Sequence, residues 1–204
     1  MGYLRSPNRL MSLEEYLAFE EQSPLRHEFI AGEVFAMSGA TTRHNLIVLN
    51  IAQTFRAVAR AHGCRVFAEA VKLRAAVDRV YYPDVVVACG PAAEVELIVE
   101  EPSVVVEVTS PATRGTDRRE KLDAYQRIPS LRMYLIVEQR WRKLIAYQRD
   151  ATGEWLRVEL EGEGEIVVPP MQVRLTLDQI YDDVPMPPIG VREGEEWDEG
   201  GEED

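Results

Sequence analysis

The sequence is poor in cysteine and in long apolar runs, and each shortage limits what the protein can be. Cys64 and Cys89 are its two cysteines, too few for a disulfide framework, so we expect two small buried hydrophobic residues in a reducing compartment. No apolar run approaches the ~20 residues of a membrane span, and residues 1–12 lack the apolar segment of a secretory signal. We therefore expect a cytoplasmic protein that does not enter a membrane.

Acidic residues outnumber basic ones, and most of the excess lies in one segment of the chain. The chain of 204 residues holds 35 acidic and 23 basic side chains, a formal net charge of −12. Most of the excess follows Tyr181, because residues 182–204 carry ten acids and one arginine. We predict a single domain over 1–181 and a disordered acidic tail over 182–204, since so polar a segment cannot bury a core.

Apolar periodicity and capping residues predict alternating helices and strands. The buried stripe of the longest helix is predicted from Leu46, Leu49, Ala52, Phe55 and Ala59. A mixed sheet flanked by helices, an α/β fold, accommodates this order. The predicted helices cover 13–22, 42–62, 114–128 and 175–181, and the predicted strands cover 27–30, 33–37, 65–68, 71–73, 80–88, 103–109, 133–137, 143–148 and 155–160.

Two carboxylates stand inside apolar strand sequences. Glu107 interrupts a valine run that reads as a central strand, and Asp84 follows Pro83 at the head of another. A buried carboxylate is costly unless it is paired or binds a cation. If the two strands are neighbours, the acids can share a divalent cation, and oxygen ligands favour Mg²⁺ or Mn²⁺ over zinc. The alternatives are a Pro-Asp turn for Asp84 and a buried ion pair with an arginine for Glu107.

The helix after the Glu107 strand carries Asp117, Lys121 and Tyr125 at intervals of four residues, and therefore on one face. Only three of the basic residues are lysines, so Lys121 is notable. It either forms a surface ion pair with Asp117 or points back at the strand of Glu107.

Together these fragments resemble the PD-(D/E)XK nuclease superfamily, and most closely a branch of short bacterial proteins of unknown function that are regarded as restriction endonucleases. The resemblance spans residues 10–181. It rests on Arg26–Glu33, His44, Tyr82-Pro83-Asp84-Val85, Val106–Pro111 and the Asp117–Lys121–Tyr125 spacing.

The resemblance implies a restriction-endonuclease-like fold and metal-dependent hydrolysis of phosphodiester bonds, with DNA as the expected substrate. Asp84, Glu107 and the Val108 carbonyl would hold Mg²⁺ or Mn²⁺, which would lower the pKa of a bound water. One departure matters: Thr109 stands where the superfamily motif has lysine. In related branches the lysine moves to the neighbouring helix, so Lys121 is the candidate, and we expect it to serve turnover rather than folding.

Six other residues within the resemblance have both a functional and a structural interpretation. Glu28, Glu33 and His44 would add a metal ligand or a phosphate contact, but a hairpin ion pair for the acids and a polar helix start for His44 are the favoured explanations. Arg114, Arg118 and Arg119 would contact phosphate, or would simply form a solvated helix face. The resemblance implies supporting positions at the site for Thr109, Asp117 and Tyr125 as well.

Two further hypotheses remain beside the nuclease. Thr109 and the near-neutral body favour a non-catalytic nucleic-acid-binding or scaffold module of the same fold. A serine hydrolase using Ser110 and His44 is disfavoured, because no Gly-x-Ser-x-Gly turn surrounds Ser110. We also predict a homodimer through the aromatic C-terminal strands with Tyr134, Trp141, Tyr147 and Trp155, the alternative being that these rings fill the core.

Overall fold

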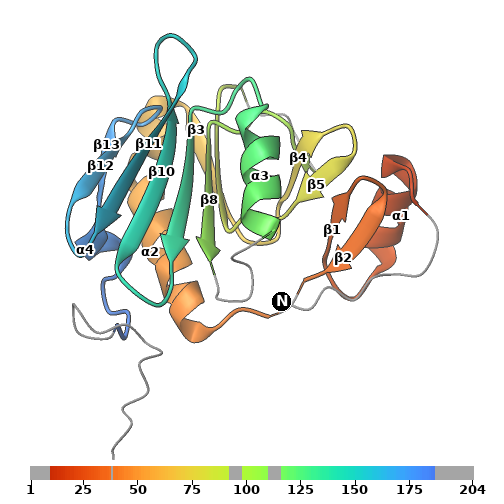
Figure 1. The fold of residues 1–204 in the computed structure, drawn as a ribbon, viewed down its shortest axis with the longest axis horizontal. Coiled ribbons are helices and arrows are strands. Elements are labelled where there is room, and N and C mark those ends of the chain that lie inside the picture. The colour runs from red at the N-terminus through yellow and green to blue at the C-terminus, as the bar shows by residue number, and fades with distance from the viewer. Residues whose placement is uncertain (1–9, 38, 92–97, 110–115, 187–204) are drawn as a thin grey trace, which may run out of the picture.

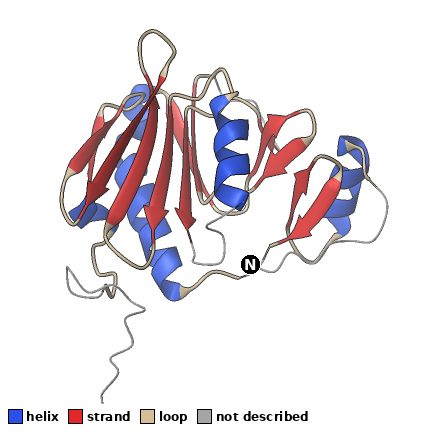
Figure 2. Cartoon of the chain, viewed as in Figure 1, coloured by secondary structure: helices blue, strands red, loops and turns tan. Residues whose placement is uncertain are grey.

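A mixed six-stranded sheet organises the chain, with a five-stranded sheet and a two-stranded hairpin beside it (Figures 1 and 2). The computed structural model describes residues 10–37, 39–91, 98–109 and 116–186, with the backbone alone at 116–118. The helices are α1 (Leu13–Gln22), α2 (Thr42–Ala59), α3 (Thr116–Gln126) and α4 (Leu177–Ile180), and a 3₁₀ turn, η1, covers Arg60–His62. The strands are β1 (His27–Ile30), β2 (Glu33–Ala36), β3 (Cys64–Ala68), β4 (Lys72–Ala76), β5 (Arg79–Tyr81), β6 (Val85–Cys89), β7 (Ile98–Val99), β8 (Val104–Thr109), β9 (Met133–Glu138), β10 (Lys143–Arg149), β11 (Trp155–Glu161), β12 (Glu165–Val168) and β13 (Val173–Thr176).

The six-stranded sheet runs in the order β11-β10-β9-β8-β6-β3 and separates two hydrophobic clusters. On one face α2 and the β12–β13 hairpin pack over the sheet, and on the other α3 and the five-stranded sheet do so. Strand β8 lies between β6 and β9, as expected for its valine run. Val104, Val106 and Val108 belong to the α2 side and Val105 to the α3 side, so alternation sends Glu107 towards α3.

The expected strand over 80–88 is wrong in one respect, because Pro83 divides it. Strand β5 ends at Tyr81 in the five-stranded sheet, and β6 begins at Val85 in the six-stranded sheet. Proline has no N–H to donate to a strand ladder, so the chain changes sheets at Tyr82-Pro83-Asp84. This crossing places Asp84 directly before β6, where the chain passes from the smaller sheet to the larger one.

The N-terminal hairpin forms as predicted. Ser12 and Glu15 make the reciprocal bonds of a capping box at the start of α1. Strands β1 and β2 pair through an Ala31-Gly32 turn whose φ angles are 51° and 87°. Because Gly32 is left-handed, and a Cβ there would lie 2.9 Å from Cβ of Leu10, the turn requires glycine. The hairpin then pairs with β5 through β1.

Other expectations need correction at single positions. The predicted Ala52, Phe55 and Ala59 are buried on α2, but Leu49 is 52% exposed. The buried face also includes Ile47, Val48 and Ile51, which the prediction left out. The last helix is shorter than predicted, since Leu175 lies in β13. The β12–β13 hairpin itself was not predicted.

The cysteines are bonded to each other, contrary to expectation. Cys64 and Cys89 stand opposite one another in the antiparallel β3–β6 register and form a disulfide. The sequence spacing of 25 residues hides this pairing, which only the register creates. The cysteine argument for a reducing compartment therefore no longer holds. Within the described ranges, no helix is long and apolar enough to cross a membrane.

The fold extends past the predicted domain end at residue 181. Val184 is buried in the α2-side cluster, and the Asn50 side chain donates to the carbonyl of Asp182. The first residues of the predicted tail therefore belong to the folded domain. The remainder of the predicted tail, residues 187–204, lies outside the described residues. Of the rings proposed for a dimer, Tyr134 is 1% exposed, and Tyr147 and Trp155 pack against the α3-side cluster, so they belong to the core.

Burial of Val184 can be measured by truncating its side chain. We expect Val184→Ala to lower the free energy of unfolding by about 1 kcal/mol or more, because methyl groups leave a packed core. Val167→Ala, on the exposed side of β12 at 42% exposure, is the matched control and should change it by less than about 0.5 kcal/mol. Equal losses in urea unfolding would contradict the burial of Val184.

Candidate active site

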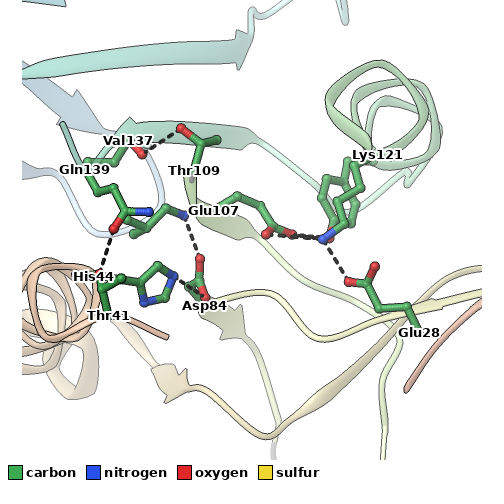
Figure 3. Close-up of polar contacts among 11 residues, drawn as sticks. Glu28, Thr41, His44, Asp84, Glu107, Thr109, Lys121, Val137 and Gln139 are labelled. Atoms are coloured by element: carbon green, nitrogen blue, oxygen red, sulfur yellow. Dashed lines mark hydrogen bonds and ion pairs between the residues drawn. The ribbon is translucent and has the colours of Figure 1, made fainter. Parts of the chain in front are cut away.

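Asp84 is fixed by two donors from different elements. Its Oδ2 accepts a hydrogen bond from the Val108 backbone N–H in β8 at 2.6 Å, and its Oδ1 lies 3.2 Å from Nε2 of His44 (Figure 3). His44 occupies the first turn of α2, whose N-cap Thr41 accepts the His44 N–H. The carboxylate thus sits near the positive end of a helix of 18 residues, which favours negative charge.

Strand β8 extends past its pairing with β6 beside Asp84. The β6–β8 pairing described by register ends at Val85 and Val106, so Val108 donates to a side chain rather than to β6. The N–H and C=O of one strand residue point to the same side. The Val108 carbonyl therefore points to the same side of β8 as the N–H that binds Asp84.

Glu107 lies on the α3 face of the sheet, where it contacts two side chains of α3. Lys121 of α3 places its Nζ 3.2 Å from Oε1 and 3.3 Å from Oε2 of Glu107, and Tyr125 donates its hydroxyl to Oε1 at 2.8 Å. The same ammonium lies 2.8 Å from Oε1 of Glu28 in β1, a close charge contact. Figure 3 shows Lys121 pointing between Glu107 and Glu28.

The charges in this cluster do not balance. Three carboxylates, those of Glu28, Asp84 and Glu107, face one lysine and one histidine, and the Lys121 and Glu28 side chains are only 10% and 5% exposed. Burial raises the pKa of Glu107 to about 8, with Asp84 and Glu28 adding to the rise and Lys121 opposing it. Burial depresses the pKa of His44, but the bond to Asp84 outweighs this and leaves it above its usual value. If all three carboxylates were ionised, the cluster would carry an excess of negative charge. Without a metal ion the proton on Glu107 relieves this excess, and a divalent cation bound in place of that proton would do the same.

Lys121 is more deeply enclosed than the sequence suggested. With 8% exposure overall, it is no surface ion-pair partner, and its side chain is directed at the strand of Glu107. We therefore expect Lys121 to serve stability at neutral pH as well as turnover. Removing the ammonium would leave Glu28 and Glu107 as buried acids without their shared cation, a costly arrangement.

Thr109 does not replace the missing motif lysine. Its hydroxyl donates to the carbonyl of Val137 at 3.3 Å and is buried at the β8–β9 pairing. Gln139, which the sequence analysis missed, follows β9 at the same edge, with its side-chain oxygen accepting from the Thr41 hydroxyl at 2.7 Å. The signal was present: neighbouring parallel strands end at one edge, and polar residues follow the apolar run of β9.

The other residues predicted for the site lie farther from the Glu107–Lys121 contact or outside the described residues. Glu33 shares the Glu28 face of the β1–β2 hairpin but lies level with Ile30. Arg119 is exposed on α3. Arg114 lies outside the described residues, and only the backbone of Asp117 and Arg118 is described.

A second polar cluster, centred on Glu20, binds the residues next to Glu28 and next to Pro83-Asp84. Glu20 of α1 accepts the Tyr82 hydroxyl at 2.7 Å and the His27 N–H at 2.9 Å. His27 precedes Glu28, and Tyr82 precedes Pro83-Asp84. The buried carboxylate of Glu20 therefore ties together the two backbone segments that present acids to the site.

The donor set fits a hard divalent cation. Asp84, Glu107 and the Val108 carbonyl offer only oxygen, which Mg²⁺ and Mn²⁺ prefer. Within the described ranges no group of three or more His, Cys, Asp or Glu side chains is close enough to enclose an ion. Mg²⁺ commonly keeps several waters, so two carboxylates and a carbonyl form an adequate set.

A family comparison places the chain. The family model Uma2, whose description is "Putative restriction endonuclease", matches residues 13–179. The chain belongs to the Uma2 family. The match includes Glu28, His44, Asp84, Glu107 and Lys121, and so covers the whole described cluster.

Individual relatives of this Uma2 chain agree with the family match. "Uncharacterized protein sll1609" of Synechocystis sp. is 31% identical over 76% of this chain and 90% of its own length. "Uncharacterized protein slr1290" of the same organism is 28% identical over 86% and 94%. A solved structure from Anabaena variabilis, titled as a putative nuclease belonging to DUF820, aligns with a TM-score of 0.71 at 16% identity over 84% of this chain and 97% of that chain.

These findings confirm the recognition of the superfamily and the fold class expected from the sequence. The Uma2 match extends over nearly the whole domain, and the structural match shares the mixed sheet with flanking helices. The family and the neighbouring structure support a nuclease-like function at the coarse level. The roles of the individual site residues stay predictions.

The raised pKa of Glu107 predicts a pH-dependent stability. Its folded-state pKa of about 8 lies above the ordinary 4.5, so folding binds a proton that the unfolded chain releases. In EDTA, the stabilising contribution is complete below about pH 4.5 and is lost as pH rises to about 8, on the order of a few kcal/mol. Glu107→Gln should therefore flatten the decline in thermal midpoint over this range. Glu100→Gln, at an exposed glutamate, is the control, and identical slopes for Glu107→Gln and the unmodified chain would show that burial does not perturb Glu107.

Proposed function

We propose that the protein is a metal-dependent nuclease that hydrolyses phosphodiester bonds of nucleic acid, with DNA as the substrate. The observation that carries the proposal is the proximity of Asp84, directly before β6, to Glu107 of β8, which also contacts the buried ammonium of Lys121. Family membership and the nuclease-like neighbour support it.

In this proposal the oxygens of Asp84, Glu107 and Val108 hold Mg²⁺ or Mn²⁺. A bound ion would supply a water of lowered pKa and would neutralise charge on the scissile phosphate. Held 3.2 Å from Glu107, the Lys121 ammonium is placed to orient that water and to stabilise developing negative charge. Glu28 and Tyr125 act on Lys121 and Glu107 as positioning residues, because they contact those side chains directly.

His44 and the start of α2 favour an anionic substrate at the same place. The His44 ring is directed at Asp84 by its Nε2, while its Nδ1 is buried and has no hydrogen-bond partner among the described residues. The free N–H groups of a helix N-terminus attract phosphate. We assign His44 to holding Asp84 in place and the first turn of α2 to phosphate approach.

A non-catalytic nucleic-acid-binding module is the second candidate. It is favoured by Thr109, whose hydroxyl is engaged with Val137, so that the motif position contributes no cation. The two candidates differ in one outcome. The nuclease cleaves in the presence of a divalent cation, whereas the module binds nucleic acid and leaves it intact.

Cleavage of supercoiled plasmid, single-stranded DNA and RNA separates these candidates. With Mg²⁺ or Mn²⁺ we expect cleavage of DNA that EDTA abolishes, and losses of about 10²-fold or more for Asp84→Asn and Lys121→Met. Lys143→Met is the matched control, because Lys143 also lies between two glutamates but in β10, and it should retain full activity. Circular dichroism of each variant checks the fold.

Binding without cleavage under every metal condition would select the scaffold module. Cleavage that Asp84→Asn leaves unchanged would place the active site elsewhere. Full activity of a folded Lys121→Met would remove Lys121 from the mechanism while leaving the metal ligands in place.

A further inference from the structure

Strand β11 is an exposed sheet edge of unusual length for this molecule. It has seven residues, against five for β3 at the opposite edge of the same sheet and four and two for the edges β2 and β7 of the smaller sheet. Its register with β10 is continuous, without a bulge, and it contains no proline. Bulges and prolines normally protect a sheet edge from pairing, and β11 has neither.

The hydrogen-bonding groups of β11 divide cleanly between its two sides. Asp150 donates to Glu154 and Gly162 donates to Arg142 at the two ends of the ladder, which makes those residues hydrogen-bonded pairs. Hydrogen-bonded pairs alternate along an antiparallel ladder, so Leu156, Val158 and Leu160 bond to β10. The N–H and C=O groups of the intervening residues, Arg157 and Glu159 among them, point outwards, and no described strand pairs there.

The side chains of this edge are apolar on one face and charged on the other. Leu156 and Val158 are 54% and 41% exposed on the α2 side of the sheet. On the opposite face Arg157 pairs with Glu159, which also contacts Lys143. An exposed apolar strip on an unpaired strand marks an interaction surface.

We propose that β11 pairs antiparallel with β11 of a second copy of this chain, about a two-fold axis at Val158. This register sets Arg157 opposite the partner's Glu159, and Glu159 opposite the partner's Arg157. On the other face it stacks Val158 on its counterpart and Leu156 on the partner's Leu160. Four outward backbone groups of each chain, the N–H and C=O of Arg157 and Glu159, gain partners.

Charge selects this register over its neighbours. An axis at Arg157 would bring two arginines together, and an axis at Glu159 would bring two glutamates together. Only the axis at Val158 places opposite charges in both central pairs, and directly opposed side chains in a sheet interact most strongly. Lys143, Arg157, Glu159 and Glu161 also cancel in formal charge, so two copies approach without net repulsion at this edge. The partner that fits this edge is therefore β11 of another copy of the chain. The sequence prediction placed the dimer interface at aromatic side chains, and this proposal places it at the β11 edge instead.

Complementary charge reversals test the pairing. The unmodified chain should be a dimer by light scattering in the micromolar range. R157E sets glutamate against glutamate twice and E159R sets arginine against arginine twice, so each should weaken dimerisation about tenfold or more. Mixed in equal amounts, R157E and E159R should form a heterodimer, because every cross-strand pair is then attractive. R174E, at an exposed Arg–Glu pair on β13, is the control and should leave the dimer intact.

Several outcomes would overturn the proposal. A monomer at the highest concentration would remove the dimer itself. A dimer that both single reversals leave unchanged would place the interface elsewhere, and a mixture of R157E and E159R that stays monomeric would exclude the Val158 register. Thermal unfolding of each variant confirms that the chain is folded, and none of these results depends on nuclease activity.

Discussion

The Lys121 ammonium is the interaction on which the site depends. It lies between Glu28 of β1 and Glu107 of β8, and it thereby links the small sheet, the large sheet and α3. Each carboxylate would be costly if buried alone. Sharing one cation lowers that cost without removing it, because Asp84 adds a third acid nearby. Without a metal ion the proton held by Glu107 relieves this cost, and a divalent cation would take the place of that proton.

The sequence predicted the parts of this arrangement that depend on local pattern. Glu107 in a valine run and Asp84 after a proline were recognised because strand alternation and the absence of a proline N–H act within a few residues. The spacing of Lys121 and Tyr125 on one helix face was likewise local, and both side chains do reach Glu107. The order of helices and strands followed from periodicity in the same way.

Long-range pairing was not accessible from the sequence. Glu28 was assigned to its own hairpin, yet its partner is on α3, 93 positions away in the chain. The Cys64–Cys89 bond depends on the β3–β6 register, and Gln139 reaches the site edge only because β9 lies parallel to β8. Leu49 failed for a related reason, since a helix has two plausible apolar stripes and tertiary packing selects one.

The central claim is that the buried acids form a cation site, and calorimetric titration with Mn²⁺ at pH 7 tests it most directly. In two buffers of different protonation enthalpy, the account predicts binding with release of roughly one proton per ion, because ligands must lose their protons to bind metal and Glu107 holds one at this pH. Glu107→Gln should weaken binding and abolish the proton release, and Asp84→Asn should weaken binding. Binding that neither substitution affects, or no binding by the folded unmodified chain, would contradict the account.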